Sequence, residues 1–356
     1  MKIALTFSSK EGLLEEYSRW RPPSSRGDSS APKDFFAEGD SPDTINAVLK
    51  ALRSGGHQAI GIEADLHSLP KLSEIKPHLV FNIAEGLYGD CRESYIPMIC
   101  EKLAIPYTGS GPLSLALCLN KARTKEVLTH YGIPNAPFIV CHPGQGATLK
   151  ELKKFKYPAI VKPVAEGSSK GIFDDSVVET PAVALRRIKE KLAKYEQAVI
   201  LEEFLPGMEM TVPMIGNGSK LEVLPIVAMN YGTLPKGARH IYSYEAKWIW
   251  DTAEKPLEIF QCPAKLSARD KKKVEGLVRR TFEVLGLRDW ARIDVRFDAR
   301  GEPNILEVNP LPGILPKPED NSCFPKGARA AGYSYEEMIN KVVDTAILRY
   351  GLKKGK

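Results

Sequence analysis

The sequence predicts an α/β fold: an open parallel sheet in the first third of the chain, followed by two α+β units. Three observations support this prediction. Short apolar strands alternate with amphipathic helices through residues 1–112, as in parallel α/β sheets. In residues 113–202, two apolar strands flank a charged helix. In residues 203–350, two strand-like runs are joined by a connection that ends at Gly301, which predicts a β-hairpin.

The composition is that of an ordinary globular protein. Its 356 residues, 43% hydrophobic and 26% charged, suffice for two or three domains. No apolar run approaches the roughly 18 residues of a membrane span, and the first strand is too short to serve as a signal peptide. The net charge of +6 is spread along the chain without a nucleic-acid-binding signature. The six cysteines show no pairing pattern, which favours reduced thiols in a cytoplasmic protein. Part of the positive charge can serve a small-molecule anionic substrate such as a nucleotide.

The N-terminal unit is expected to begin with a strand and to contain a long insertion. The insertion, residues 8–42, is rich in Pro, Ser and Gly in its middle and predicts a mobile loop. A helix capped by Asp43 should then end at Gly55 and Gly56. The other elements expected here are the strands Lys2–Phe7, Ala59–Ile62 and His78–Ile83, and a helix around residues 94–103.

The later elements follow from the same patterns. A helix is expected over Asn120–Tyr131, and the strands of the second unit over Tyr157–Pro163 and Ala198–Glu202. The charged helix between those strands is Pro181–Tyr195, and Ser334–Leu348 forms the last helix. The predicted hairpin pairs Arg292–Phe297 with Ile305–Val308.

This hairpin is a candidate metal site. Asp294 and Glu307 can lie across the ladder from each other, and Asn309 projects to the same face as Glu307 because strand side chains alternate. Two carboxylates and an amide oxygen suit Mg²⁺, which completes its coordination with water and substrate phosphates. The alternative is a surface hairpin whose acids face solvent.

Two further stretches suggest a nucleotide site. The loop Glu166–Ile172 follows a strand that ends beside Lys162, and its glycines and serines can offer backbone N–H groups to phosphates. The buried strand Val199–Glu203 can present backbone groups to an adenine edge, with Glu209 just beyond it. A plain surface turn and a core strand with exposed acids are the simpler readings of each stretch taken alone.

Taken together, seven motifs resemble the D-alanine–D-alanine ligase family of ATP-grasp enzymes. The resemblance spans roughly Phe81 to Leu348 and includes motifs from both ATP-grasp domains. In chain order the motifs are IPYTGSG (Ile105–Gly111), LNKARTK (Leu119–Lys125), VKPVAEGSSKGI (Val161–Ile172), VILEEFLPGMEMTV (Val199–Val212), YEAK (Tyr244–Lys247), ARIDV (Ala291–Val295) and LEVNPLPG (Leu306–Gly313).

The resemblance implies an ATP-grasp fold with a Rossmann-like N-terminal domain. It also implies a carboxylate–amine ligase that uses ATP and two Mg²⁺ ions, forms an acyl phosphate and works as a homodimer. The implied phosphate contacts are Lys121, Lys162, Lys247, Ser168 and Ser169; the adenosine contacts are Glu202, Phe204, Leu205 and Glu209; the Mg²⁺ ligands are Asp294, Glu307 and Asn309. Arg292 and the N–H of Gly313 would stabilise the oxyanion, and Ser322 would hold the second substrate's carboxylate.

Three departures from the family pattern concern the substrates. The family's acidic N-terminal signature is absent, and an ungapped count puts Glu15 at the position that binds the first substrate's ammonium, with Glu11 and Glu16 as alternatives. Trp248 replaces a tyrosine that joins Ser168 and the glutamate in a hydrogen-bonded triad, although an indole can only donate. The link from residue 314 to 322 is longer than in the family.

The sequence therefore predicts intact ligase chemistry beside a remodelled amino-acid site. The first interpretation is a D-alanine–D-alanine ligase-like enzyme, with a role in peptidoglycan precursor synthesis. The first alternative is a ligase for another amino acid or peptide in specialised biosynthesis. The second is an ATP-binding protein without turnover, which would have lost metal or oxyanion residues; Asp294, Glu307, Asn309 and Arg292 are all present.

Overall fold

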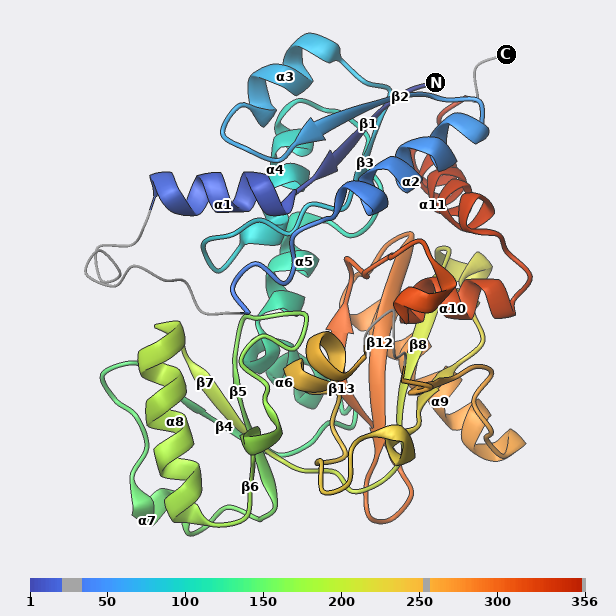
Figure 1. Ribbon diagram of the computed structural model, residues 1–356. Coiled ribbons are helices and arrows are strands. Elements are labelled where there is room, and N and C mark those ends of the chain that lie inside the picture. Colours follow the sequence, from blue (N-terminus) through green and yellow to red (C-terminus); the bar gives the residue numbers. More distant parts are fainter. Residues whose placement is uncertain (21–33, 252–256, 354–356) are drawn as a thin grey trace.

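The computed structural model describes residues 1–20, 34–251 and 257–353. Three sheets make up the framework, and Figure 1 shows them as an upper N-terminal unit, a smaller unit at the lower left and a larger unit at the lower right. None of the helices in these ranges is long and apolar enough to cross a membrane.

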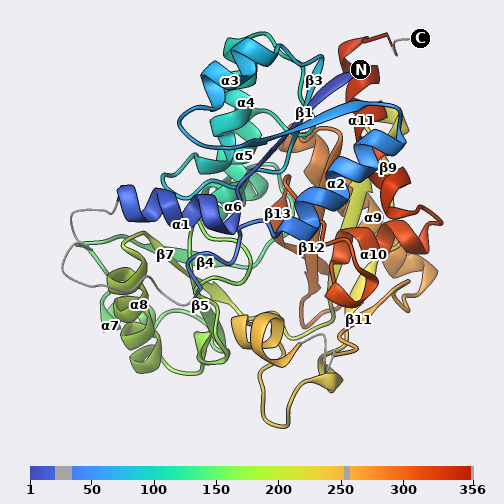
Figure 2. The same cartoon turned by 45° about the horizontal axis from the view of Figure 1, so that its top comes forward.

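The N-terminal sheet is parallel, with strand order β2-β1-β3, as the strand–helix alternation predicted. Its elements are β1 (Lys2–Phe7), α2 (Pro42–Ser54), β2 (Gln58–Glu63), α3 (Ser68–Ile75), β3 (Leu79–Asn82) and α4 (Tyr95–Lys102). The apolar face of α2 packs Val48 and Leu52 against Val342 and Val343 of the last helix, α11 (Tyr335–Tyr350). Figure 2 shows these two helices side by side, so the C-terminus closes the core of the first unit.

The prediction of one long loop over residues 8–42 is wrong at both ends. Residues Lys10–Arg19 form helix α1, because Ser9 caps its first turn and Leu13 and Tyr17 give it a buried face. The chain returns along β1, where Ser9 pairs with Asp40. The N-cap of α2 is Ser41 and not Asp43, since the Ser41 hydroxyl accepts the N–H of Thr44. Residues 21–33 lie outside the described ranges.

The second sheet is antiparallel, with order β4-β7-β5-β6. It consists of β4 (Phe138–Cys141), β5 (Ala159–Pro163), β6 (Val177–Val178) and β7 (Val199–Glu203), with helices α7 (Leu149–Leu152) and α8 (Pro181–Tyr195). The helix α8 has the predicted bounds and packs Ala184 and Ile188 on the sheet. Helices α5 (Pro112–Leu119) and α6 (Lys121–His130) lead into this unit from the first.

The third sheet follows the order β11-β10-β8-β12-β13, with β9 on β8. Its elements are β8 (Glu209–Ile215), β9 (Glu222–Val223), β10 (Val227–Met229), β11 (Phe260–Gln261), α9 (Ala268–Val284), β12 (Trp290–Phe297), β13 (Pro303–Asn309) and α10 (Cys323–Ala330). The predicted hairpin is present as β12–β13, and Asp294 pairs directly with Glu307. The domain boundaries proposed at 112 and 202 stay a prediction.

Candidate active site

The three units surround one cavity of about 460 Å³. It is lined by residues of the N-terminal segment, the loop 166–172, the hairpin β12–β13 and the link 310–323. Of the predicted site residues, the structure brings these to the cavity: Lys121, Lys162, Ser168, Ser169, Glu202, Phe204, Leu205, Glu209, Lys247, Trp248, Arg292, Asp294, Glu307, Asn309, Gly313 and Ser322. Only Glu15 is absent from this wall.

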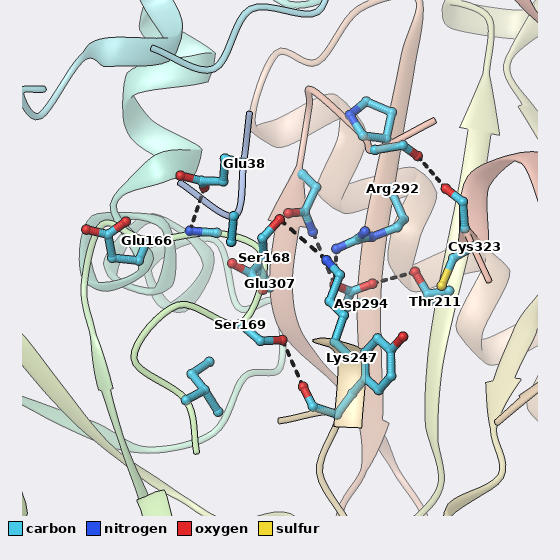
Figure 3. Close-up of a pocket in the computed structure, with 18 of the residues that line it drawn as sticks. Glu38, Glu166, Ser168, Ser169, Thr211, Lys247, Arg292, Asp294, Glu307 and Cys323 are labelled. Atoms are coloured by element: carbon cyan, nitrogen blue, oxygen red, sulfur yellow. Dashed lines mark hydrogen bonds and ion pairs between the residues drawn. The ribbon is translucent and has the colours of Figure 1, made fainter. Parts of the chain in front are cut away.

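The hairpin presents the predicted oxygen ligands on one face of its ladder (Figure 3). Asp294 accepts hydrogen bonds from Arg292 Nη2 at 3.0 Å, Asn309 Nδ2 at 3.1 Å and the Thr211 hydroxyl of the neighbouring strand. The second acid, Glu307, lies 2.7 Å from Lys121 Nζ. Burial raises the pKa of Asp294. For Glu307 burial acts in the same direction, but Lys121, Lys162 and Arg292 together lower its pKa. The acids are thus held in place by buried cations.

The end of the cavity formed by β7 and β8 contains three buried ion pairs. Glu202, at the end of β7, lies 3.1 Å from Lys162 and 3.3 Å from Lys125. Glu209, at the start of β8, pairs with Arg296 at 2.8 Å, and the Arg296 guanidinium lies over the Phe204 ring at 4.4 Å. These pairs hold Glu202, Glu209 and the Phe204 ring in place between the second and third sheets.

The loop over the cavity is bent by two residues in the left-handed region, Ser168 (φ 49°) and Ser169 (φ 61°). Both side chains contact the third unit: the Ser169 hydroxyl donates to the Tyr242 carbonyl at 2.8 Å, and Lys247 Nζ donates to Ser168 Oγ at 3.4 Å. Burial, helped by Arg292, lowers the pKa of Lys247 to about 8. The loop therefore places its two hydroxyls beside a cluster of positive charge.

The same loop is fastened at its other side to the N-terminal segment 34–40. Glu38 accepts the N–H of Gly167 at 2.9 Å and pairs with Lys170 at 2.7 Å and Arg92 at 2.8 Å. The Asp34 carboxylate accepts the N–H of Gly171 at 2.8 Å. Since the Glu38 side chain is only 5% exposed, this is a buried charge cluster and not a surface contact.

Sequence counting placed the wrong acid at this wall. Glu15 lies on the exposed side of α1, where its side chain is 71% exposed and pairs with Arg19 at 2.7 Å. Four other acids of the first unit, Glu38, Asp40, Glu85 and Glu93, line the cavity instead. The sequence signal was weak: Glu38 follows a Phe-Phe-Ala run immediately before the helix α2, inside a stretch interpreted as loop.

The departures around the second substrate take definite positions. Trp248 Nε1 donates to the Ser168 carbonyl at 3.2 Å, so the indole contacts the loop backbone and not its hydroxyl. The Ser322 hydroxyl donates to the Gly313 carbonyl at 3.1 Å, which brings the start of α10 to the cavity. The longer link is tied to the first unit by Lys317, 2.7 Å from Asp43.

Sequence reasoning missed several residues that hold the site together. Thr211 is opposite Asp294 only because β8 and β12 pair in that register. Arg296 lies two residues beyond Asp294 on the same strand, so strand alternation predicts that both side chains lie on the same face. The other residues that were not foreseen are Asp34, Glu38, Glu85, Arg92, Glu93, Lys125 and Lys170.

Comparisons with known proteins show which family the chain belongs to. The family model described as D-ala D-ala ligase C-terminus matches residues 127–344, more than half of the chain. A D-alanine–D-alanine ligase of Glaesserella parasuis is 36% identical, over 84% of this chain and 90% of its own length. One from Mannheimia succiniciproducens is 33% identical over 84% and 90%, and an uncharacterized protein of Sinorhizobium fredii is 32% identical over 86% and 88%.

A solved structure supports the fold. The D-alanine–D-alanine ligase of Bacillus anthracis complexed with ATP superposes with a TM-score of 0.69, covering 98% of both chains at 22% identity. The architecture is therefore the ATP-grasp fold that the motifs predicted. Sequence and structure agree that the chain belongs to the D-alanine–D-alanine ligase family.

Proposed function

We propose that this protein is an ATP- and Mg²⁺-dependent carboxylate–amine ligase that forms an amide bond through an acyl phosphate. The observation that supports this most is the cavity itself. Asp294, Glu307 and Asn309 form one oxygen-rich face, and Lys121 and Lys247 line the same cavity beneath a phosphate-covering loop. Several family members with about 33–36% identity bear the name D-alanine–D-alanine ligase.

The residues divide the work by charge. A donor carboxylate and the γ-phosphate of ATP repel each other, so the reaction needs positive groups at the point of transfer. Lys121, Lys162 and Lys247 supply these charges around the phosphates. Arg292 and the N–H of Gly313 would receive the negative oxygen of the tetrahedral intermediate, and Ser322 would orient the acceptor's carboxylate.

The hairpin suits magnesium. Its donor set is made of oxygen atoms alone, two carboxylates and an amide, as Mg²⁺ prefers beside substrate phosphates. Asp294, Glu307 and Asn309 would hold the ions, which supply charge neutralisation for the phosphates. Arg292 and Lys121 pair with the two acids from the protein side.

The test is phosphate release from ATP and Mg²⁺ with D-alanine alone, other single amino acids, pairs and short peptides, with masses of the products. Release with D-alanine and a dipeptide product would support cell-wall precursor synthesis. Release only with other substrates would support the alternative, a ligase of specialised biosynthesis, which Trp248 and the long link 314–322 favour. ATP binding without release on any substrate would contradict the ligase proposal and favour a non-catalytic ATP-binding protein.

The cellular setting is part of the same proposal. The six cysteines are all free thiols, which fits a cytoplasmic enzyme supplied with ATP and amino acids. A homodimer, implied by the family resemblance, stays a prediction that sedimentation would check.

A further inference from the structure

One wall of the cavity has more negative charge than the side chains around it balance. The N-terminal unit contributes four acids to the cavity lining: Glu38, Asp40, Glu85 and Glu93. Glu38 and the loop residue Glu166 pair with Arg92 and Lys170, at separations of 2.6–2.8 Å for the close contacts. Two acids and two bases balance there. Asp40, Glu85 and Glu93 remain, and they are called the acidic subsite below.

The acids of this subsite have few partners. Glu93 is 8% exposed and lines the cavity, yet its side chain forms no hydrogen bond or ion pair with any residue that the structure describes. The Glu85 side chain also lacks both within the described ranges, and Asp40 accepts only the Ser8 N–H at 3.3 Å. Carboxyl groups that open into a cavity without a protein partner can be balanced by a cation that binds there.

The nearby positive groups are already engaged. Arg92 is next to both acids but pairs with Glu38, and Lys121, on the far side of Glu93, pairs with Glu307. Lys10 also lines the cavity but lies over the Trp248 ring, 6.0 Å from its centre. Burial and the neighbouring acids raise the pKa of Glu93 to about 7 and that of Glu85 well above its usual range.

The geometry favours an organic cation over a metal ion. In the described part of the chain, no three Asp, Glu, His or Cys side chains are arranged closely enough to hold a metal. The subsite also lies beside Lys121 and Glu307, where the donor carboxylate would meet the γ-phosphate. The donor would therefore reach Glu93, whereas Asp40 lies toward Tyr335, whose hydroxyl donates to the Ile314 carbonyl of the link.

We propose that the acidic subsite binds a second cationic group of the donor, so that the preferred first substrate is an amino acid with a positively charged side chain. This inference rests on the proposed ligase function and specifies its substrate class. One α-ammonium pairs with one carboxyl group, whereas the subsite offers three, and a bound cation would lower their raised pKa values. A diamino acid with a short side chain supplies the second positive charge within the cavity.

The test compares isosteric donors with the full-length enzyme, ATP and Mg²⁺. Each cationic amino acid is matched by a neutral one of equal length: 2,3-diaminopropionate with 2-aminobutyrate, 2,4-diaminobutyrate with norvaline, and ornithine with norleucine, in both enantiomers. The expected result is at least a tenfold higher kcat/KM for the cationic member of the best pair. Calorimetric titration with 2,4-diaminobutyrate in the presence of ADP and Mg²⁺ provides a second readout that needs no turnover.

Variants identify the residues. Glu93→Gln is expected to reduce the preference for the cationic donor at least tenfold, and to leave the thermal midpoint unchanged or raised, because it removes an unpaired buried charge. Glu85→Gln serves as an independent second variant. Asp90→Asn is the matched control, since Asp90 lies on the same loop but is exposed and outside the cavity.

The outcomes separate the two proposals. Turnover of neutral donors with kcat/KM equal to or above that of their cationic partners would overturn this inference and leave the ligase function standing. A preference unchanged in both Glu93→Gln and Glu85→Gln would also overturn it. If none of the donors led to phosphate release, the proposed function would be contradicted. In that case, calorimetry showing no binding of 2,4-diaminobutyrate would separately reject the subsite.

Discussion

Replacing Glu38 with glutamine tests whether the N-terminal segment holds the phosphate loop. The Glu38 carboxylate is 5% exposed and lies within 2.7–2.9 Å of Arg92 Nη2, Lys170 Nζ and the Gly167 N–H. Removing one partner of a buried ion pair costs about 3–5 kcal/mol, because the opposite charges stay buried. Glu166 remains 2.6 Å from Lys170, which favours the lower end, about 3 kcal/mol.

Urea unfolding, followed by tryptophan fluorescence, measures this loss. With slopes of about 1–3 kcal/mol per molar urea, a loss of about 3 kcal/mol lowers the midpoint by at least about 1 M. The kcat/KM for ATP should fall at least tenfold, since the loop loses an anchor on one side of Ser168. Glu38 thereby connects the stability of the first unit to the position of the phosphate site.

The control is Glu15→Gln, which changes an equally charged residue of the same N-terminal region. Its pair with Arg19 is exposed on both sides, so the expected change is below about 0.5 kcal/mol, without an effect on kcat/KM. The result that would refute a buried charge cluster as the anchor of the loop is an unfolding free energy of both the Glu38 and the Glu15 variant within about 0.5 kcal/mol of the parent protein.

Three other predictions concern the catalytic groups. Glu307→Gln should lower kcat by about 10²–10³ while the fold persists. The control is Glu302→Gln, which changes an exposed acid on the same hairpin and should leave kcat unchanged. Phosphate release measures both variants, and near-normal turnover of Glu307→Gln would reject the metal site. Because burial lowers the pKa of Lys247 to about 8 from 10.5, the Lys247 side chain loses its positive charge as pH rises through 8. The kcat/KM for ATP should therefore fall above pH 8. This fall should vanish in Lys247→Arg, and a fall that persists in that variant would belong to another group. Trp248→Phe removes the 3.2 Å hydrogen bond to the Ser168 carbonyl, which is worth about 1 kcal/mol. The KM for ATP should therefore rise about fivefold. An unchanged KM would mean that the indole N–H does not position the loop.

Local patterns predicted the elements that depend on neighbours in the chain. The bounds of α8 and the pairing of Asp294 with Glu307 follow from periodicity and from the length of one turn. The prediction failed in residues 8–42, where Ser9 and two buried apolar residues form a helix inside a stretch judged by its Pro, Ser and Gly content. Composition averaged over a long segment concealed a short amphipathic helix at its start.

The sequence by itself determined that Asp294 and Glu307 share one face of the hairpin, because they lie on two adjacent strands whose alternation is local. It also located the loop 166–172 and the lysines that the motifs contain. Only the tertiary structure decided which acids of the first unit line the cavity. Glu38 meets Gly167 across 129 positions of sequence, and such a contact depends on how α1 and the first sheet pack against the second unit. No periodicity encodes a contact between units, so the choice between Glu15 and Glu38 required the assembled fold.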